Sequence, residues 1–272
     1  MGCLILALHV SPVMNFTIDP EWWKTLFDDI YLVTDARTVC DEEITRREVD
    51  LLCELLPLQR EHRILDLCGG HGRHSFELHA RGFRGCTLLD YSNYLIDHAR
   101  TRAAASQCRL ELIQADARNT GLPSACFDHV IIMGNSLGYL PDPEADREIL
   151  AEAKRVLSAG GWLLIDVVDR TAVCESLKPV AWHEIGADTV VCRQREIRGN
   201  RVCARELVLS KQRGLVRDRT YSIRLYDSCT LTALLEQAEF EQISIRRGFS
   251  FHRLKGDYGC MNQRMIATCR KP

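Results

Sequence analysis

The fold is decided by the stretch Arg63-Ile64-Leu65-Asp66-Leu67-Cys68-Gly69-Gly70-His71-Gly72-Arg73-His74. A short apolar run, typical of a buried strand, leads into a glycine-rich turn and then into a helical pattern. Such a turn lets a ligand approach the bare backbone, and the N-terminus of the following helix favours an anionic group. The stretch therefore predicts a nucleotide-type cofactor site at the end of a buried strand.

The chain around this turn alternates between two kinds of segment. Apolar strands are expected at residues 64–67, 85–89, 110–114, 128–133, 162–168, 241–247 and 265–269. Amphipathic helices are expected at residues 74–81, 93–104, 143–157 and 230–239. Continuous apolar strands separated by helices predict a parallel sheet that is covered on both faces. We therefore predict an α/β protein with a doubly wound, Rossmann-like, mostly parallel seven-stranded sheet.

Two helices are predicted before the sheet. Asp19-Pro20-Glu21 begins the first, and residues 41–56 form the second. The first helix carries an aromatic stripe, for which packing is favoured over ligand contact. The stripe consists of Trp22, Trp23, Leu26, Phe27, Ile30 and Tyr31.

The pattern changes between the fifth and sixth predicted strands. There the chain reads as antiparallel β-strands separated by glycine turns, with no helix between them. We divide the chain into an N-terminal extension (1–18), a cofactor-binding core with N-terminal helices (19–169), a β insertion that caps the substrate (170–226) and the C-terminal part of the core (227–272).

The residues around the turn discriminate between two cofactors, a nicotinamide dinucleotide and S-adenosylmethionine (SAM). Asp90 ends the next predicted strand, 18 residues after Gly72, where a carboxylate can accept both hydroxyls of a ribose. Ser75 stands where the dinucleotide fingerprint has Gly or Ala. Asp66, under the turn, suits a ligand ammonium group better than phosphates, and Asp116 can accept from an adenine amino group. These acids favour SAM.

Five segments in order resemble the motifs of class I SAM-dependent methyltransferases. They are residues 64–72, Asp90-Tyr91-Ser92, Gln114-Ala115-Asp116-Ala117, Phe127-Asp128 and residues 155–161. Two segments are also similar to a group of bacterial small-molecule methyltransferases that carries a β insertion before its last helix. These are Cys68-Gly69-Gly70-His71-Gly72-Arg73-His74 and Met133-Gly134-Asn135-Ser136-Leu137-Gly138-Tyr139. One departure is Cys68, which stands where the family has the first glycine of its motif.

The resemblance implies a role for each matching residue. Asp66 would hold the methionine amino group, and Asp90 would accept the ribose hydroxyls. Arg73 could pair with the methionine carboxylate, although an exposed first-turn arginine fits the sequence equally well. Asn135 would lie beneath the methionine moiety, near the entrance for the acceptor. The other cofactor contacts would be Cys68, Gly70, Gly72, Tyr91, Asp116 and Ala117.

Methyl transfer from SAM mainly requires alignment. The sulfonium methyl group is already electrophilic, so the protein must align a lone pair with it and exclude water. A base is needed only for an acceptor that arrives protonated. Tyr139 is the preferred catalytic candidate because it follows the fourth strand, whereas a packed structural role is favoured for His183 beside Trp182. The full set of candidates is Tyr139, Asn135 and His183, with Tyr31 and Tyr226 as further bases.

The composition is that of an ordinary globular protein, with 46% hydrophobic and 26% charged residues. A net charge of −2 does not favour a polyanion or a membrane as partner. None of the 13 cysteines has a Cys-x-x-Cys or metal-ligand spacing, so we expect reduced thiols, no metal and a cytoplasmic location. The apolar run at residues 3–10 is too short to span a bilayer.

We predict a SAM-dependent methyltransferase that methylates an N or O atom of a small-molecule acceptor and releases S-adenosylhomocysteine (SAH). Residues 193–224 carry ten Arg/Lys and three Asp/Glu, which reads first as a solvated face and second as a site for an anionic acceptor. The alternatives are a methyltransferase of RNA or protein, a non-catalytic SAM-binding protein and an NAD(P)-dependent oxidoreductase. A monomer and a homodimer both fit the sequence.

Overall fold

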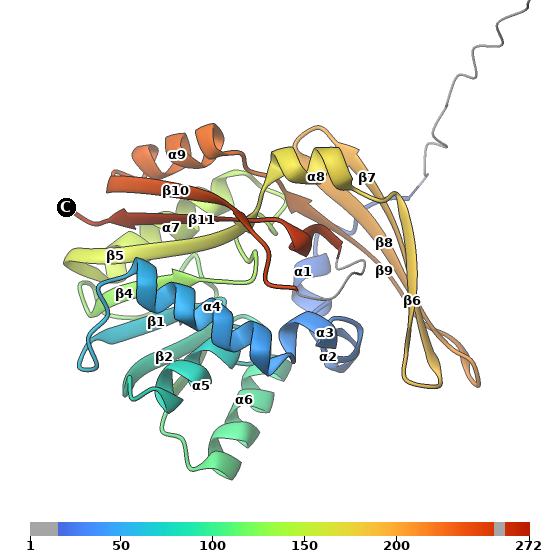
Figure 1. Ribbon diagram of the computed structural model, residues 1–272, viewed down its shortest axis with the longest axis horizontal. Coiled ribbons are helices and arrows are strands. Elements are labelled where there is room, and N and C mark those ends of the chain that lie inside the picture. The colour runs from blue at the N-terminus through green and yellow to red at the C-terminus, as the bar shows by residue number, and fades with distance from the viewer. Residues whose placement is uncertain (1–15, 253–258) are drawn as a thin grey trace, which may run out of the picture.

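A computed structural model describes residues 16–252 and 259–272 of the protein. Its larger sheet has the strand order β10-β11-β5-β4-β1-β2-β3 (Figure 1). The strands are β1 (Arg63–Leu67), β2 (Gly85–Asp90), β3 (Glu111–Gln114), β4 (Phe127–Ile132), β5 (Leu157–Val168), β10 (Glu241–Phe249) and β11 (Arg264–Arg270). Strands β1 to β5 pair in parallel, and β11 runs antiparallel to both of its neighbours. The predicted seven-stranded, mostly parallel, Rossmann-like sheet is confirmed.

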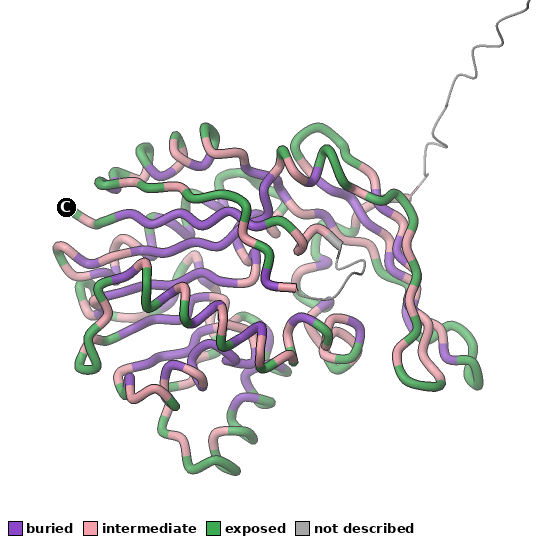
Figure 2. The backbone as a smooth tube through the Cα atoms, viewed as in Figure 1, coloured by how far each residue is buried: buried purple, intermediate pink, exposed green. Residues whose placement is uncertain are grey.

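Helices cover both faces of this sheet, because successive residues of a strand point to opposite sides. The helices are α4 (Glu42–Leu55), α5 (Arg73–Ala80), α6 (Asn93–Ser106), α7 (Glu144–Val156) and α9 (Ser228–Gln237). Ile64 of β1 packs on the face of α4 and α5, whereas Leu65 packs on the face of α7 and α9. Leu88 of β2 contacts α6 through Ile96. The central strands are therefore buried along most of their length (Figure 2), and their carboxyl ends are left for a ligand.

A second sheet stands beside the carboxyl ends of these strands (Figure 1). Its strands, antiparallel in the order β6-β7-β8-β9, are β6 (Val180–Ile185), β7 (Thr189–Arg198), β8 (Arg201–Ser210) and β9 (Gly214–Arg224). We call it the cap sheet. The predicted β insertion is confirmed, but a helix, α8 (Arg170–Ser176), precedes it and was not predicted. Asp169 caps α8 by accepting a hydrogen bond from Thr171 N at 2.9 Å.

The prediction of one continuous N-terminal helix is wrong. The segment forms α1 (Trp22–Thr25), α2 (Asp29–Thr34) and α3 (Ala36–Val39). At the first break, Arg217 Nη2 donates to Leu26 O at 2.8 Å, so that carbonyl is held by the cap sheet. The Asp28 carboxylate then accepts from Tyr31 N at 3.1 Å and starts a new helix. The second predicted helix is present as α4, which Asp41 caps at Ile44 N.

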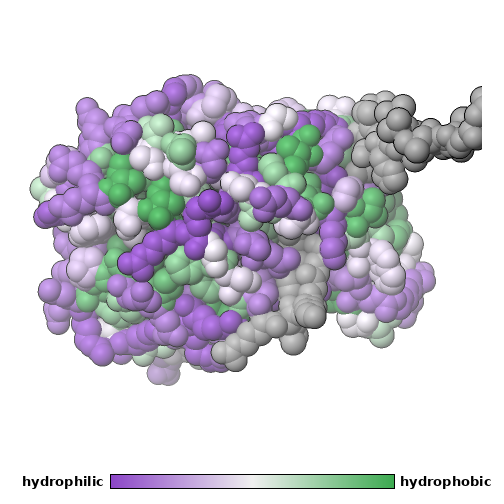
Figure 3. Space-filling model, turned by 45° about the horizontal axis from the view of Figure 1, so that its top comes forward, coloured by the Kyte–Doolittle hydropathy of each residue, from purple (hydrophilic) through white to green (hydrophobic). Residues whose placement is uncertain are grey.

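The face of the molecule drawn in Figure 3 is mostly polar. Figure 3 shows one face of the molecule, on which hydrophilic side chains surround smaller hydrophobic patches. In the described ranges, no helix combines the length and the apolar character needed to cross a membrane. The cysteines of these ranges are free thiols, and no three His, Cys, Asp or Glu side chains within them are grouped to hold a metal ion.

Candidate functional site: a cavity between the two sheets

A cavity of about 210 Å³ lies between the carboxyl ends of the central strands and the cap sheet. Its lining includes the glycine turn after β1, the ends of β2 to β4, helices α1 to α3, strands β7 to β9 of the cap sheet, and Cys260 and Met261 before β11. The fold thus brings the turn that is predicted to bind a cofactor together with segments that lie far from it in the sequence.

The glycine turn has a backbone that permits close approach. Cys68, Gly70 and Gly72 have φ values of 61°, 61° and 80°. Gly69 N donates to Leu89 O at 3.1 Å, which ties the turn to β2. Cys68 is the unusual member, because this left-handed conformation costs a residue with a Cβ roughly 1–2 kcal/mol. Gly69 and Gly70 leave their part of the cavity wall without side-chain cover.

Asp90 ends β2 and lines the cavity. Its Oδ2 accepts from Gly70 N and its Oδ1 from Ser92 N, both at 2.8 Å. Burial raises the pKa of this carboxyl to about 6. Each carboxylate oxygen keeps a further lone pair, so Asp90 can accept two more hydrogen bonds from neighbouring hydroxyls while it holds the turn.

Asp66 supports the turn from within the core and is not among the residues that line the cavity. Its Oδ2 accepts from Ser75 Oγ at 2.7 Å. Its Oδ1 is buried and has no hydrogen-bond partner among the residues described. Burial raises the pKa of this carboxyl. A contact between Asp66 and a ligand ammonium group stays a prediction, for which Oδ1 is the open acceptor.

The residues predicted to surround an adenine lie together where the neighbouring strands β2 and β3 end. Tyr91, Asp116 and Ala117 all line it. The ring of Trp23 lies 4.7 Å from that of Tyr91, centroid to centroid. Arg118, which the sequence did not single out, donates to Asp116 at 2.6 Å and lowers the pKa of its carboxyl. This region therefore offers aromatic faces and an ionised acceptor to a flat heterocycle.

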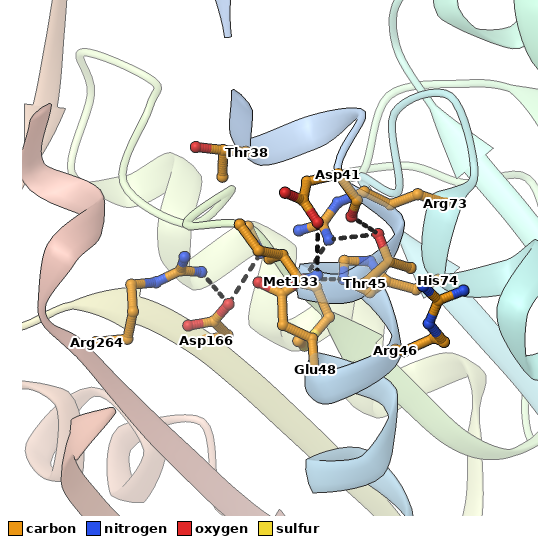
Figure 4. A network of polar contacts seen from close by, with 12 residues as sticks. Thr38, Asp41, Thr45, Arg46, Glu48, Arg73, His74, Met133, Asp166 and Arg264 are labelled. Atoms are coloured by element: carbon orange, nitrogen blue, oxygen red, sulfur yellow. Dashed lines mark hydrogen bonds and ion pairs between the residues drawn. The ribbon is translucent and has the colours of Figure 1, made fainter. Parts of the chain in front are cut away.

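A buried charge network lies beside the glycine turn (Figure 4). Glu48 of α4 forms an ion pair with Arg73 and lies 2.9 Å from His74 Nε2. Arg73 Nη1 also donates to Thr45 Oγ1 at 3.1 Å. Burial alone would raise the pKa of Glu48, but Arg73 and His74 lower it well below its ordinary value. The network joins α4 to the first turn of α5.

Arg73 is buried, so its interpretation as an exposed first-turn arginine is wrong. Only 6% of the residue is exposed, and it lines the cavity. Its charge is balanced by Glu48 of α4, to which the sequence analysis assigned no role. A guanidinium has five N–H donors, so Arg73 keeps donors for a ligand carboxylate. That contact stays a prediction.

Of the three predicted catalytic residues, Tyr139 alone lines the cavity. Its ring stacks on Phe27, with centroids 5.6 Å apart, and meets Trp22 edge-on at 5.4 Å. Asn135 is instead fully buried, and its Oδ1 accepts from Val168 N at 2.9 Å. Its amide oxygen therefore holds the end of β4 against β5, while its Nδ2 is buried without a partner among the residues described.

His183 in β6 is also outside the set of residues that line the cavity. Burial lowers the pKa of its ring to about 4, and its Nε2 is buried without a hydrogen-bond partner among the residues described. Tyr226 is buried as well, and its hydroxyl donates to Asp146. Neither His183 nor Asn135 is among the residues that line the cavity, so a catalytic role for either stays a prediction without support from the geometry.

The individual side chains that the cap sheet contributes to the cavity were not predicted, although a capping role for the insertion was. Arg193, Glu206 and Arg217 line the cavity from β7, β8 and β9, and Asp35 joins them from between α2 and α3. Arg193 pairs with Asp35 at 2.9 Å and with Glu206 at 2.7 Å. Arg217 pairs with Asp28 at 2.9 Å. The favoured interpretation of these arginines as a solvated face is wrong, and the period-two spacing within the strands was the signal that could have identified an inward face.

Comparisons with known proteins agree with this geometry. Residues 64–161 match the sequence model of the methyltransferase domain family. The chain is 27% identical over 207 residues to a Bacillus subtilis (strain 168) protein named "Putative methyltransferase YqeM". That alignment covers 74% of this chain and 78% of the relative.

Solved structures show the same fold. A SAM-dependent methyltransferase from Clostridium acetobutylicum ATCC 824 aligns with a TM-score of 0.70 at 16% identity, covering 89% of this chain and 96% of that one. SAM-bound CalS10, an amino pentose methyltransferase from Micromonospora echinaspora, aligns with a TM-score of 0.65 at 16% identity, covering 95% and 99%. The chain therefore has the fold of SAM-dependent methyltransferases, and the segment that holds its glycine turn matches the methyltransferase domain family.

Proposed function

We propose that the protein is a SAM-dependent methyltransferase that transfers a methyl group to a nitrogen or oxygen atom of a small molecule. The observation that carries the proposal is the position of Asp90, whose carboxylate holds Gly70 N at 2.8 Å and faces the cavity. The family match and the fold support the class of reaction. The cap sheet and helices α1 to α3 cover the cavity, and this cover favours a small-molecule acceptor over a macromolecule.

The cofactor would lie along the glycine turn. SAM, when bound, supplies an electrophilic methyl group on a sulfonium centre. Asp90 would accept the ribose hydroxyls, Tyr91 and Ala117 would flank the adenine, and Asp116 would accept from its amino group. The backbone at residues 68–72 would follow the cofactor closely, since its glycines leave that wall uncovered.

The methionine end would lie nearer to the buried charge network. Arg73 would donate to the carboxylate with the N–H groups that Glu48 and Thr45 leave unused. Asp66 Oδ1 would accept from the amino group, directly or through water. Tyr139 would then line the acceptor side. Because burial raises its pKa, its phenol stays neutral and positions the acceptor by hydrogen bonding.

Lowering the pH from 7 to 5 should weaken SAH binding by about tenfold. The pKa of Asp90 is raised to about 6, so its carboxylate is ionised at pH 7 and mostly protonated one unit below that pKa. Protonation removes acceptor capacity for the ribose hydroxyls, and the loss therefore falls between pH 7 and 5. Calorimetric titration with SAH at pH 7, 6 and 5 measures it.

The variant Asp90→Ala provides the control. It should bind SAH more weakly by about 1–3 kcal/mol at pH 7, because it lacks the acceptor and loosens the turn. Its affinity should also depend less on pH than that of the wild type. Unchanged SAH affinity in Asp90→Ala would remove this residue from the cofactor site and with it the main support for the proposed function.

Tyr139→Phe should lower turnover by about fivefold and leave SAH affinity within a factor of two, since one lost hydrogen bond is worth about 1 kcal/mol. The ring and its stacking on Phe27 remain, so only the hydroxyl is lost. Steady-state release of SAH in the presence of an acceptor measures turnover, and calorimetry measures affinity. Tyr94→Phe, at an exposed tyrosine of α6, is the matched control. Equal turnover in the two variants would exclude Tyr139 from the acceptor site.

A further inference from the structure

Three tyrosine hydroxyls face the cavity without a protein partner. Tyr31 from α2, Tyr139 after β4 and Tyr221 from β9 all line it. Within the described part of the chain, none of the three hydroxyls makes a hydrogen bond. None of them is among the fully buried polar atoms that lack a partner, so each hydroxyl is accessible. Each hydroxyl is therefore open to a ligand in the cavity.

The rings of these tyrosines belong to one continuous cluster, which we call the aromatic wall. Phe27 meets Tyr31 edge-on at 5.0 Å and stacks on Tyr139 at 5.6 Å. Trp22 contacts Tyr139 at 5.4 Å and Tyr221 at 5.8 Å. Burial raises the pKa of Tyr221 to about 12 and that of the other two phenols as well. At neutral pH the wall is therefore uncharged, and its ring faces attract cations.

The charged groups around the wall do not favour an anion. Arg193 is paired with Asp35 and Glu206, and Arg217 is paired with Asp28. Arg195, the third arginine of this region, also has an interaction of its own. The charges of Arg193 and Arg217 are therefore balanced by carboxylates of the protein, which disfavours their use for an acidic acceptor.

Asp35 is the carboxylate that remains open to a ligand. A third of its side chain is exposed (33%), against 4% for Glu206. Its Oδ2 accepts from Arg193 Nη2 and from Thr34 Oγ1, both at 2.9 Å. Its Oδ1 has no partner among the residues that the structure describes. An acceptor oxygen that no protein donor uses, beside aromatic faces, is a suitable site for an ammonium group.

We propose that the acceptor is a small amine, which the aromatic wall and Asp35 hold, and that the methyl group is transferred to its nitrogen. This inference rests on the proposed function and narrows its acceptor to one chemical class. It also replaces the expectation of an anionic acceptor, because Arg193 and Arg217, which line the cavity, are paired with carboxylates.

In this reaction Asp35 would act as the base that removes a proton from the acceptor. An alkyl amine is an ammonium ion at neutral pH and must lose a proton before it has a lone pair to donate. Asp35 Oδ1 can accept that proton and release it to water. The nitrogen lone pair then forms a bond to the methyl carbon while the carbon–sulfur bond breaks and its electron pair stays on sulfur. The positive charge leaves on the methylated ammonium product.

Three probes of one shape test the proposal: 2-phenylethylamine, 2-phenylethanol and phenylacetate. Each is added to the full chain saturated with SAH, and binding is measured by ligand-observed NMR. The amine should bind at least tenfold more tightly than the carboxylate. With SAM in place of SAH, mass spectrometry should show the amine gaining one methyl group.

Two variants show whether the named residues cause the preference. Asp35→Asn should reduce amine affinity at least tenfold and change alcohol affinity little, with SAH affinity retained. Tyr221→Phe, which removes one hydroxyl, should weaken both the amine and the alcohol. Asp218→Asn, which breaks an exposed ion pair with Arg205 outside the cavity, is the control and should change neither.

The outcomes separate the two proposals. If the wild-type protein did not bind SAH, the proposed function would be contradicted. SAH binding with no preference for the amine, including no binding of any probe, would overturn the amine proposal alone. An amine preference that survives in both Asp35→Asn and Tyr221→Phe would also overturn it, because the preference would then come from elsewhere.

Discussion

Glu48→Ala should lower the free energy of unfolding by about 3–5 kcal/mol. Glu48 is fully buried and compensates Arg73, which is itself 6% exposed. Removing one partner of a buried ion pair leaves the other charge without compensation, which is far more costly than the loss of a surface pair. Equilibrium urea denaturation measures the change. Glu54→Ala, which removes an exposed ion pair with Arg246 from the same helix, should cost less than about 1 kcal/mol.

A second substitution distinguishes charge from packing. Adding Arg73→Met to Glu48→Ala removes both buried charges and should recover part of the lost stability. If Glu48→Ala were no more destabilising than Glu54→Ala, the network would not be a stabilising feature of the fold. If the double variant were simply the sum of its parts, the two side chains would not be coupled.

Gly69→Ala should abolish cofactor binding and destabilise the fold by about 1–3 kcal/mol. A Cβ at this position would lie 2.5 Å from Asp66 Cγ and would also overlap Leu88 Cδ1. Both neighbours are buried, so the turn itself must shift to accommodate the methyl group. That shift moves Gly70 N away from Asp90, which it contacts at 2.8 Å. Calorimetric titration with SAH and thermal denaturation measure the two effects.

The matched control is Gly199→Ala, in the turn between β7 and β8. Gly199 has a φ of 62°, and a Cβ there would meet nothing within 4 Å. Gly199→Ala should lower the free energy of unfolding only by the cost of placing a Cβ in the left-handed conformation, roughly 1–2 kcal/mol. Its SAH affinity should be unchanged. Wild-type SAH affinity in Gly69→Ala would show that the tight packing beneath the turn is not required for the site.

The seven-stranded sheet could be predicted because its signals are local. Apolar runs such as 64–67 and 162–168 identify strands by composition alone, and the helices between them have a clear period. Asp90 and Asp116 could be placed at the cavity for the same reason. Acids that end neighbouring parallel strands must meet at one edge of the sheet, and both do line the cavity.

The errors arose where distant side chains decide the local structure. The N-terminal helix is broken because Arg217, almost two hundred residues away, holds Leu26 O. Asn135 follows a strand as expected, yet its amide bonds to Val168 N in the core. Arg193 appeared to be a surface cation, because its partners Asp35 and Glu206 belong to separate segments. Such pairings carry no periodic signal, so the sequence alone could not reveal them.

Trp22 and Trp23 are neighbours in the chain but contact different regions of the cavity. Trp23 packs on Tyr91, at the end proposed for the adenine, while Trp22 packs on Tyr139, at the end proposed for the acceptor. One peptide unit therefore connects both binding regions. A ligand that displaced the ring of Trp23 would therefore act on the same backbone that carries Trp22. Occupancy of the proposed cofactor region and the position of the aromatic wall are thus expected to depend on each other.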